Sequence, residues 1–276
     1  MDATRSSFLL SLLLPGITLA AWPRHTIDDT AAGADGVRLG DLTGDGLTDI
    51  VTGFEEGGVV RAYLHPGANK VTQPWPYETV AQVASPEDAV FADIDGDGTP
   101  EVVTSSEGKT QSVFLSTRSA DGTWDTSPFP TTQGEQRWMF CLPHDTAQDG
   151  DLDLIIGSKG NNATVSLLTN PGTNQALDPQ HWKLSKLATA SWIMSLVTID
   201  ETTILYSDRK AKDAAGVYRL TSSDAGWQTA PVGALGNEVL FLDHADLDLD
   251  GDKDIAVTAK PSSIILLWNE GMNSPH

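Results

Sequence analysis

The chain has 276 residues, of which 39% are hydrophobic, so it could form one large all-β domain or two small domains. Its formal net charge is −21, with 38 acidic and 17 basic residues. This balance argues against nucleic acid and anionic membranes as partners, because binding to phosphate depends on lysine and arginine. The single cysteine, Cys141, excludes an internal disulfide bond and is expected to be a small buried hydrophobic residue.

The first 20 residues have the composition of a secretory signal peptide. Arg5 precedes the apolar run 8–14, and Thr18 and Ala20 are small residues suited to a cleavage site. The apolar run is short for a membrane span. We therefore expect residues 1–20 to be removed on export. The mature protein is then expected to be secreted, periplasmic or extracellular, without membrane insertion after cleavage.

Four acidic stretches, at residues 41–49, 93–101, 145–153 and 246–254, share one pattern. Oxygen-bearing side chains recur at positions 1, 3, 5 and 9, glycine occupies position 6, and position 7 offers a backbone carbonyl group. Alternate carboxylates around a glycine turn are how a short loop binds calcium. The predicted calcium ligands are Asp41, Thr43, Asp45, Leu47, Asp49, Asp93, Asp95, Asp97, Thr99, Glu101, Asp145, Asp149, Asp151, Asp153, Asp246, Asp248, Asp250, Asp252 and Asp254.

Acidic turns without metal are the alternative for these stretches. At 145–153 that alternative is as good as calcium binding, because Ala147 replaces the position-3 ligand. An EF-hand is excluded, since the three full copies have Thr52, Thr104 and Val257 at position 12, where an EF-hand needs glutamate. Each stretch is instead followed by a short β-branched run, which predicts that the loop joins two buried strands.

The chain is repetitive with a period of about 50 residues. Loops begin at steps of 52 residues up to Asp145, and the next begins 101 residues later at Asp246. A degenerate unit is therefore expected between them, with strands at 191–200 and 203–207 joined by a tight turn. Strand-like runs with the same period begin near Trp22, Trp75, Trp124, Trp182 and Trp227. Four strands in each unit indicate the blades of a β-propeller.

The predicted fold class is thus all-β, a propeller of four-stranded blades that occupies residues 22–270 as a single domain. The segment 22–27 is a spare strand at the N-terminus, whereas the last unit ends at 264–268 without its fourth strand. Pairing of these two segments would close a ring of five blades and leave no free edge. Six or seven blades are the alternative. A parallel β-helix is excluded, because its repeats are nonapeptides.

The acidic loops between apolar strands resemble the FG-GAP/VCBS repeats of bacterial secreted proteins and are similar to the calcium loops of integrin α-chain propellers. The resemblance covers roughly residues 22–270 and is carried by the three full loops. It implies that calcium is held by the loop carboxylates. Rings of this family more often have seven blades.

Candidate ligand-binding residues lie where the innermost strands are expected to begin, on loops over a central channel. They are Glu87, Asp88, Arg137, Trp138, Trp192 and Glu238. Such a mixture of charged and aromatic side chains would suit a sugar or a peptide. The alternative is that the two tryptophans are core residues and the charges are solvated. The tract 207–210, placed where the fourth unit lacks its acidic loop, is interpreted as a local salt bridge, with a binding site as the alternative.

The six histidines occur without an HExxH motif or a nucleophile elbow. We therefore expect a calcium-stabilised, non-catalytic binding or adhesion module whose partner is a glycan or an extracellular protein. The alternative is a secreted glycosidase or lyase that uses Glu87 and Glu238 as paired carboxylates. Enzymatic activity is thus left open, with binding favoured.

Overall fold

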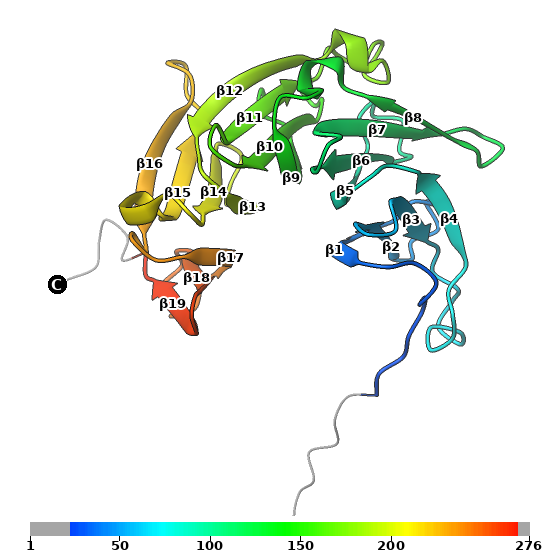
Figure 1. Ribbon diagram of the computed structural model, residues 1–276, viewed down its shortest axis with the longest axis horizontal. Helices are drawn as coiled ribbons and strands as arrows, with labels where there is room; N and C mark the ends of the chain where they lie inside the picture. The colour runs from blue at the N-terminus through cyan, green and yellow to red at the C-terminus, as the bar shows by residue number, and fades with distance from the viewer. Residues whose placement is uncertain (1–22, 270–276) are drawn as a thin grey trace, which may run out of the picture.

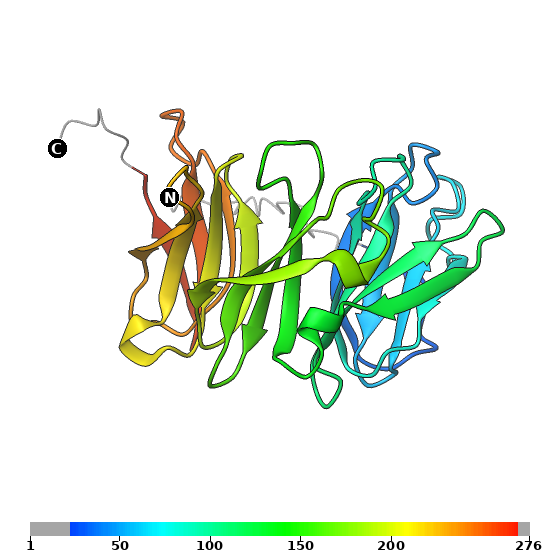
Figure 2. The same cartoon turned by 90° about the horizontal axis from the view of Figure 1, so that it is seen from above.

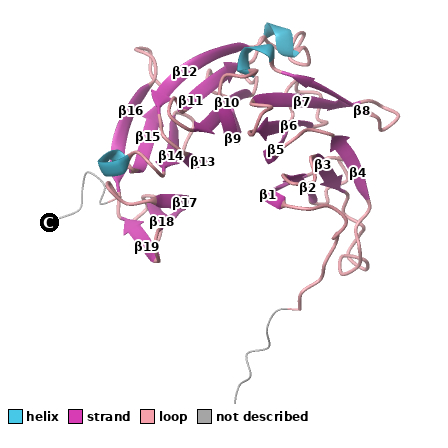
Figure 3. Ribbon diagram, in the orientation of Figure 1, coloured by secondary structure: helices cyan, strands magenta, loops and turns pink. Residues whose placement is uncertain are grey.

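A computed structural model describes residues 23–269 of the protein. This part of the chain forms 19 β-strands and three short 3-10 helices, and the strands make five antiparallel sheets. The sheets stand side by side in an arc around a central space, with the first strand of each sheet innermost (Figures 1 and 2). Strands dominate the whole arc (Figure 3). The all-β prediction is confirmed, and the arrangement is propeller-like.

Within each sheet, every strand is bonded to the next one along the chain. The first sheet consists of β1 (Ala34–Gly40), β2 (Asp49–Phe54), β3 (Val59–Tyr63) and β4 (Tyr77–Ala81). The second consists of β5 (Pro86–Ala92), β6 (Glu101–Ser106), β7 (Ser112–Arg118) and β8 (Trp124–Pro128). The third consists of β9 (Arg137–His144), β10 (Asp153–Lys159), β11 (Thr164–Thr169) and β12 (Lys183–Thr189). The fourth consists of β13 (Ile193–Thr198), β14 (Thr203–Asp208), β15 (Gly216–Thr221) and β16 (Gln228–Gly233), and the fifth of β17 (Val239–Ala245), β18 (Asp254–Ala259) and β19 (Ser263–Leu267).

The 3-10 helices are single turns outside the sheets. They are η1 (Pro130–Thr132), η2 (Pro179–His181) and η3 (Lys212–Ala214). The first two lie on the outer rim between the second and third sheets, and η3 connects β14 to β15. No helix among residues 23–269 is long and apolar enough to cross a membrane.

Hydrophobic side chains form four clusters, one between each pair of neighbouring sheets. Between the second and third sheets, for example, Leu115 packs in one cluster with Trp138 and Leu154. The second strand of a sheet is covered on both faces, and β6 is buried along its whole length, including its threonine and serine residues. Four clusters are what an open arc of five sheets provides, since a closed ring would need a fifth between the first and last sheets.

The predicted closure by the segment 22–27 is not present. Trp22 lies outside the described residues, residues 23–27 form no strand, and the fifth sheet has three strands. The N-terminal segment instead follows the first sheet. The Ile27 carbonyl oxygen accepts a hydrogen bond from the Trp75 N–H group at 3.1 Å. The Asp28 carboxylate forms an ion pair with Arg61 and accepts a 2.5 Å hydrogen bond from the Tyr63 hydroxyl group. These contacts hold the segment away from β19.

Other sequence predictions are confirmed. The fourth sheet has the expected tight turn between β13 and β14 in place of an acidic loop. Fourth strands begin at or just after a tryptophan, as at Trp124 in β8 and Trp182 before β12. Cys141 is buried, and burial raises the pKa of its thiol. The predicted signal peptide at 1–20 lies outside the described residues.

The innermost strand of all five sheets has a β-bulge near its first residues. The register with the second strand shifts between Asp35 and Arg38 in β1, and at the equivalent place in β5, β9, β13 and β17. A bulge bends its strand and changes the direction of the side chains beside it. This irregularity shapes the centre of the arc, where the pocket described below lies.

Candidate functional site

The four acidic loops have one conformation. In each, the position-1 carboxylate accepts a hydrogen bond from the N–H group of the position-6 glycine, at distances between 2.8 and 3.1 Å. These glycines adopt the left-handed conformation, with φ from +79° to +100°, which other residues rarely adopt. They are Gly46, Gly98, Gly150 and Gly251. The loop therefore curls around its first carboxylate as the sequence pattern predicts.

The position-9 carboxylate is buried and ties each loop to its sheet. The residues are Asp49, Glu101, Asp153 and Asp254. In the first loop, Asp49 accepts hydrogen bonds from the N–H groups of Leu42 at 2.9 Å and His65 at 2.8 Å, the latter just after β3. Asp153 and Asp254 bind the N–H groups of Asn170 and Asn269 in the same way. This carboxylate therefore has a structural role in addition to any contact with an ion.

Two loops bring three carboxylates close enough to share a cation. Ligand oxygens of Asp93, Asp95 and Glu101 lie within 4.8 Å of one another, as do those of Asp246, Asp248 and Asp250. In the first group, the Asp93 Oδ1 atom is buried without a hydrogen-bond partner among the described residues. Burial, reinforced by Asp95, raises the pKa of Glu101 to about 7. A hard cation would satisfy the orphaned oxygen and the clustered charge, so these residues fit calcium.

The other two loops lack a carboxylate at position 3. Position 3 is Thr43 in one and Ala147 in the other. Within residues 23–269, neither loop has three acidic or histidine side chains within the same distance. In 145–153, Asp153 is bonded to the Thr146 hydroxyl group, and Asp151 accepts a hydrogen bond from the Thr173 hydroxyl group at 3.2 Å. Calcium binding at 145–153 is thus the least supported of the four.

The tight turn of the fourth sheet is held by side chains from both neighbouring sheets. The His144 Nε2 atom lies 3.0 Å from the Glu201 carbonyl oxygen, and the His244 Nε2 atom lies 2.9 Å from that of Thr198. The Lys253 ammonium group donates to the Ile199 carbonyl oxygen at 2.7 Å. Imidazole and ammonium groups therefore stabilise the turn that has no acidic loop.

Residues 41–104 match the family model of the FG-GAP-like repeat. This stretch is an FG-GAP-like repeat. It begins at the first acidic loop, includes β2 to β5 and the loop 93–101, and ends within β6. The predicted resemblance is confirmed for this part of the chain. No curated protein matches the chain.

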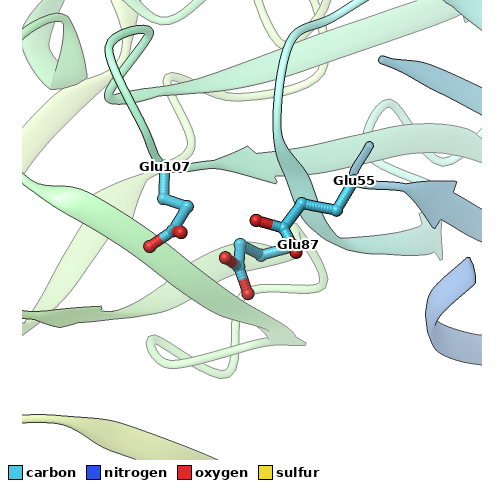
Figure 4. A group of neighbouring side chains, drawn as sticks. All are labelled: Glu55, Glu87 and Glu107. Atoms are coloured by element: carbon cyan, nitrogen blue, oxygen red, sulfur yellow. The ribbon is translucent and has the colours of Figure 1, made fainter. Parts of the chain in front are cut away.

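A second acidic group lies at the end of the first two sheets that is opposite their acidic loops. Glu55 follows β2, Glu87 lies in β5 and Glu107 follows β6, and their carboxylates face one another (Figure 4). The Lys159 ammonium group at the end of β10 lies 3.5 Å from Glu87 and forms a closer ion pair with Glu107. Lysine thus supplies the cation here. Burial, together with Glu107, raises the pKa of Glu87 to about 8.

Ionisation of Glu87 is expected to destabilise the fold as the pH rises. The pKa of Glu87 in the folded protein is above the ordinary 4.5. The protonated form therefore contributes its full stabilisation of the fold below about pH 4.5, and this contribution is lost as the pH rises through about 8. Relative to the parent protein, the Glu87→Gln variant should gain free energy of unfolding from pH 5 to 8, by at most about 1.4 kcal/mol per pH unit. Urea titrations measure this difference. Glu135→Gln, at an exposed glutamate, is the control, and parallel pH profiles for both variants would contradict the assignment.

Asp88 and Trp138 are internal residues, although both are predicted ligand contacts. Asp88 is fully buried and accepts two hydrogen bonds from the Arg38 guanidinium group, at 3.0 and 2.8 Å, and one from the Cys141 N–H group at 3.3 Å. It therefore links the first three sheets. Trp138 is fully buried, and its indole N–H group donates to the Thr132 carbonyl oxygen at 3.1 Å. Neither side chain is available to a ligand.

The remaining predicted contacts lie at the same end of the sheets as the glutamate group. Trp192 is partly buried, and Arg137 is exposed at the start of β9. Glu238 accepts a 2.6 Å hydrogen bond from Arg209 and lies 3.8 Å from Lys260, and the first of these contacts lowers the pKa of Glu238. Glu87 and Glu238 therefore belong to separate ion-pair groups. The tract 207–210 forms a salt bridge, but not the predicted local one: Arg209 pairs with Glu238 of the loop before β17, at the opposite end of the fourth sheet from its short turn.

The sequence does not predict the pocket with exposed apolar side chains at the centre of the arc. A pocket of about 350 Å³ is lined by residues of β1, β9, β13 and β17, the innermost strands in Figure 1. Val37 and Phe241 in its wall are 63% and 56% exposed. The Phe140 and Phe241 rings meet edge to face at 6.4 Å. Val37 and Phe241 lie at the bulges of their strands, which sequence patterns do not reveal, so alternation alone could not place them.

Proposed function

We propose that the protein is an exported, calcium-stabilised β-propeller that binds a glycan or an extracellular protein without converting it. The observation that carries the proposal is the central pocket, in which side chains from four sheets are exposed toward one space. Exposed apolar groups inside a pocket favour a ligand with an apolar face. The faces of sugar rings and the apolar side chains of peptides have this property.

Calcium and export rest on separate features. The carboxylate groups at 93–101 and 246–254 fit calcium, and the FG-GAP-like repeat has loops of the kind that hold it in this family. Bound calcium would neutralise part of the charge of −21. Weak loop sites of this kind suit the millimolar calcium outside cells, in agreement with a signal peptide at 1–20. The five sheets support a count of five blades.

The geometry favours binding over glycoside hydrolysis. In a glycosidase, two carboxyl groups face the substrate from about 5–10 Å apart. Glu87 is paired with Lys159, and Glu238 with Arg209. Among residues 23–269, the side chains that line the central pocket include neither glutamate. The two are therefore poorly placed to act together on a ligand bound there.

A panel of immobilised polysaccharides and extracellular proteins tests the proposal, with calcium in the buffer and with both retention and soluble products measured. We expect retention without products. Phe241→Ala should weaken retention about tenfold, since burying a large apolar side chain contributes about 1.5–3 kcal/mol. Leu177→Ala, at another exposed apolar residue, is the control and should change nothing. Product formation that disappears in Glu87→Gln or Glu238→Gln would overturn the proposal.

A further inference from the structure

At the end of the sheets opposite the acidic loops, acidic and basic residues are segregated between the first two sheets and the last three. In every sheet, one charged residue lies at the end of the second strand or directly after it. In chain order these residues are Glu55, Glu107, Lys159, Arg209 and Lys260. The first two sheets therefore present acid at this position and the last three present base. This concentration of base occurs in a chain whose net charge is −21.

Trp192 organises the basic side. The Lys159 Nζ, Arg209 Cζ and Lys210 Nζ atoms lie 4.8, 4.7 and 4.2 Å from the centroid of its ring. Cations at this distance from an indole face are attracted by the ring. Like charges that would otherwise repel one another are thus held together between the third and fourth sheets.

A pocket of about 340 Å³ adjoins this group between the fourth and fifth sheets. Its charged lining residues are Arg209, Lys210, Lys212 and Asp213, from the connection between β14 and β15, and Glu238, from the loop before β17. Lys212 has a φ of +52°, a conformation that is strained for lysine. Such strain persists only where the surrounding structure holds the backbone in place. Here the surrounding structure holds the backbone of Lys212, a charged residue in the wall of the pocket.

Three basic side chains line this pocket against two carboxylates, those of Asp213 and Glu238, so its positive charge is only partly neutralised. Glu238 is engaged by the Arg209 Nε atom and by Lys260. Among residues 23–269, Lys210 and Lys212 have no ion-pair partner. The Arg209 side chain donates its hydrogen bond to Glu238 through Nε, and its two terminal nitrogens have no hydrogen-bond partner among residues 23–269. The pocket therefore has unused donors of the type that binds carboxylate, sulfate or phosphate groups.

We infer that this pocket binds the oxyanion group of a small ligand, such as an acidic monosaccharide. The volume suits a small molecule. The net charge of −21 disfavours a polyanion, whose distant charges would meet the acidic surface. Attraction within the pocket acts over a few ångströms, where salt screens less than it does between distant charges. The pocket does not share lining residues with the central pocket, so this inference does not depend on the proposed function.

Isothermal titration calorimetry of the full chain in calcium-containing buffer tests the inference. The probes are glucuronate, galactose 6-sulfate, inorganic sulfate and neutral glucose. We expect saturable binding of at least one anion and none of glucose. Equal affinity for sulfate and the acidic sugars would mean that the anion alone is recognised, and tighter binding of the sugars would mean that the ring is recognised too. Either result supports the inference.

Replacement of the two unpaired lysines makes the test specific. The double variant Lys210→Ala/Lys212→Ala should weaken anion binding about tenfold or more, because hydrogen bonds to charged groups are among the stronger ones. Lys183→Ala/Lys186→Ala, at two exposed lysines of β12, makes the same change of charge elsewhere and should leave the affinity unaltered. Melting temperatures check that both variants are folded. Absence of anion binding by the parent protein, equal binding of glucose, or equal losses in both double variants would overturn the inference.

Discussion

Removal of calcium is expected to lower the melting temperature by about 10 °C or more. At free calcium 100 times the dissociation constant, each bound loop adds about 2.7 kcal/mol to the free energy of unfolding. For a chain of this size, each kcal/mol corresponds to roughly 2–4 °C. Two well-formed carboxylate groups, at 93–101 and 246–254, are enough for this effect. Scanning calorimetry in calcium, in magnesium and in a calcium chelator measures it.

A charge-neutral variant of one loop separates ion binding from folding of the loop. Asp248→Asn/Asp250→Asn keeps side chains that can accept the local N–H hydrogen bonds but removes two of three clustered charges. In chelator, this variant should melt at or above the parent temperature, because mutual repulsion is relieved. In calcium it should melt below the parent. Asp224→Asn, on an exposed turn, should behave as the parent does. An unchanged melting temperature of the parent in chelator would rule out calcium as a stabilising ligand.

Loss of the Arg38 guanidinium group is expected to cost about 3–5 kcal/mol of the free energy of unfolding. Its partner Asp88 is fully buried, and without the arginine it would be an uncompensated charge. Burial already raises the pKa of Asp88 in the presence of Arg38. The double variant Arg38→Ala/Asp88→Asn should recover part of the loss, because no buried charge remains. Urea unfolding of both variants gives the two values.

A second ion pair provides the matched control. Arg118 donates two hydrogen bonds to Glu78, at 2.8 and 2.6 Å, also between the first and second sheets. Both of its side chains are partly exposed, at 26% and 21%. Arg118→Ala should therefore cost about 1 kcal/mol or less. Equal losses in the two arginine variants would show that burial of Asp88 does not determine the effect.

The parts of the site that the sequence predicts are those built from neighbouring residues. The acidic loops were predictable because their ligands and glycine lie within nine consecutive positions and fold alike. The strand that follows each loop was predictable because it is covered on both faces. Trp182 marks a fourth strand for a similar reason, as its ring is buried next to that strand.

Contacts between distant residues were beyond these patterns. Trp138 and Trp192 both occur where an inner strand begins, yet one is core and the other is partly exposed. The difference depends on Thr132 and on the cations around Trp192, which are contributed by other segments. Asp88 finds its partner fifty residues away. The pattern of the segment 22–27 predicts a strand of the last sheet, but Asp28 next to it pairs with Arg61 of the first sheet.

The turn between β13 and β14 differs from the acidic loops of the other sheets in what holds it together. His144, His244 and Lys253 hold that turn with protein groups alone. We therefore expect the order of this turn not to depend on the concentration of free calcium. The loops at 93–101 and 246–254, in the second and fifth sheets, instead carry clustered carboxylates that a cation would neutralise. A fall in calcium would then loosen the molecule on either side of a sheet that keeps its structure, and proteolysis would begin at those two loops.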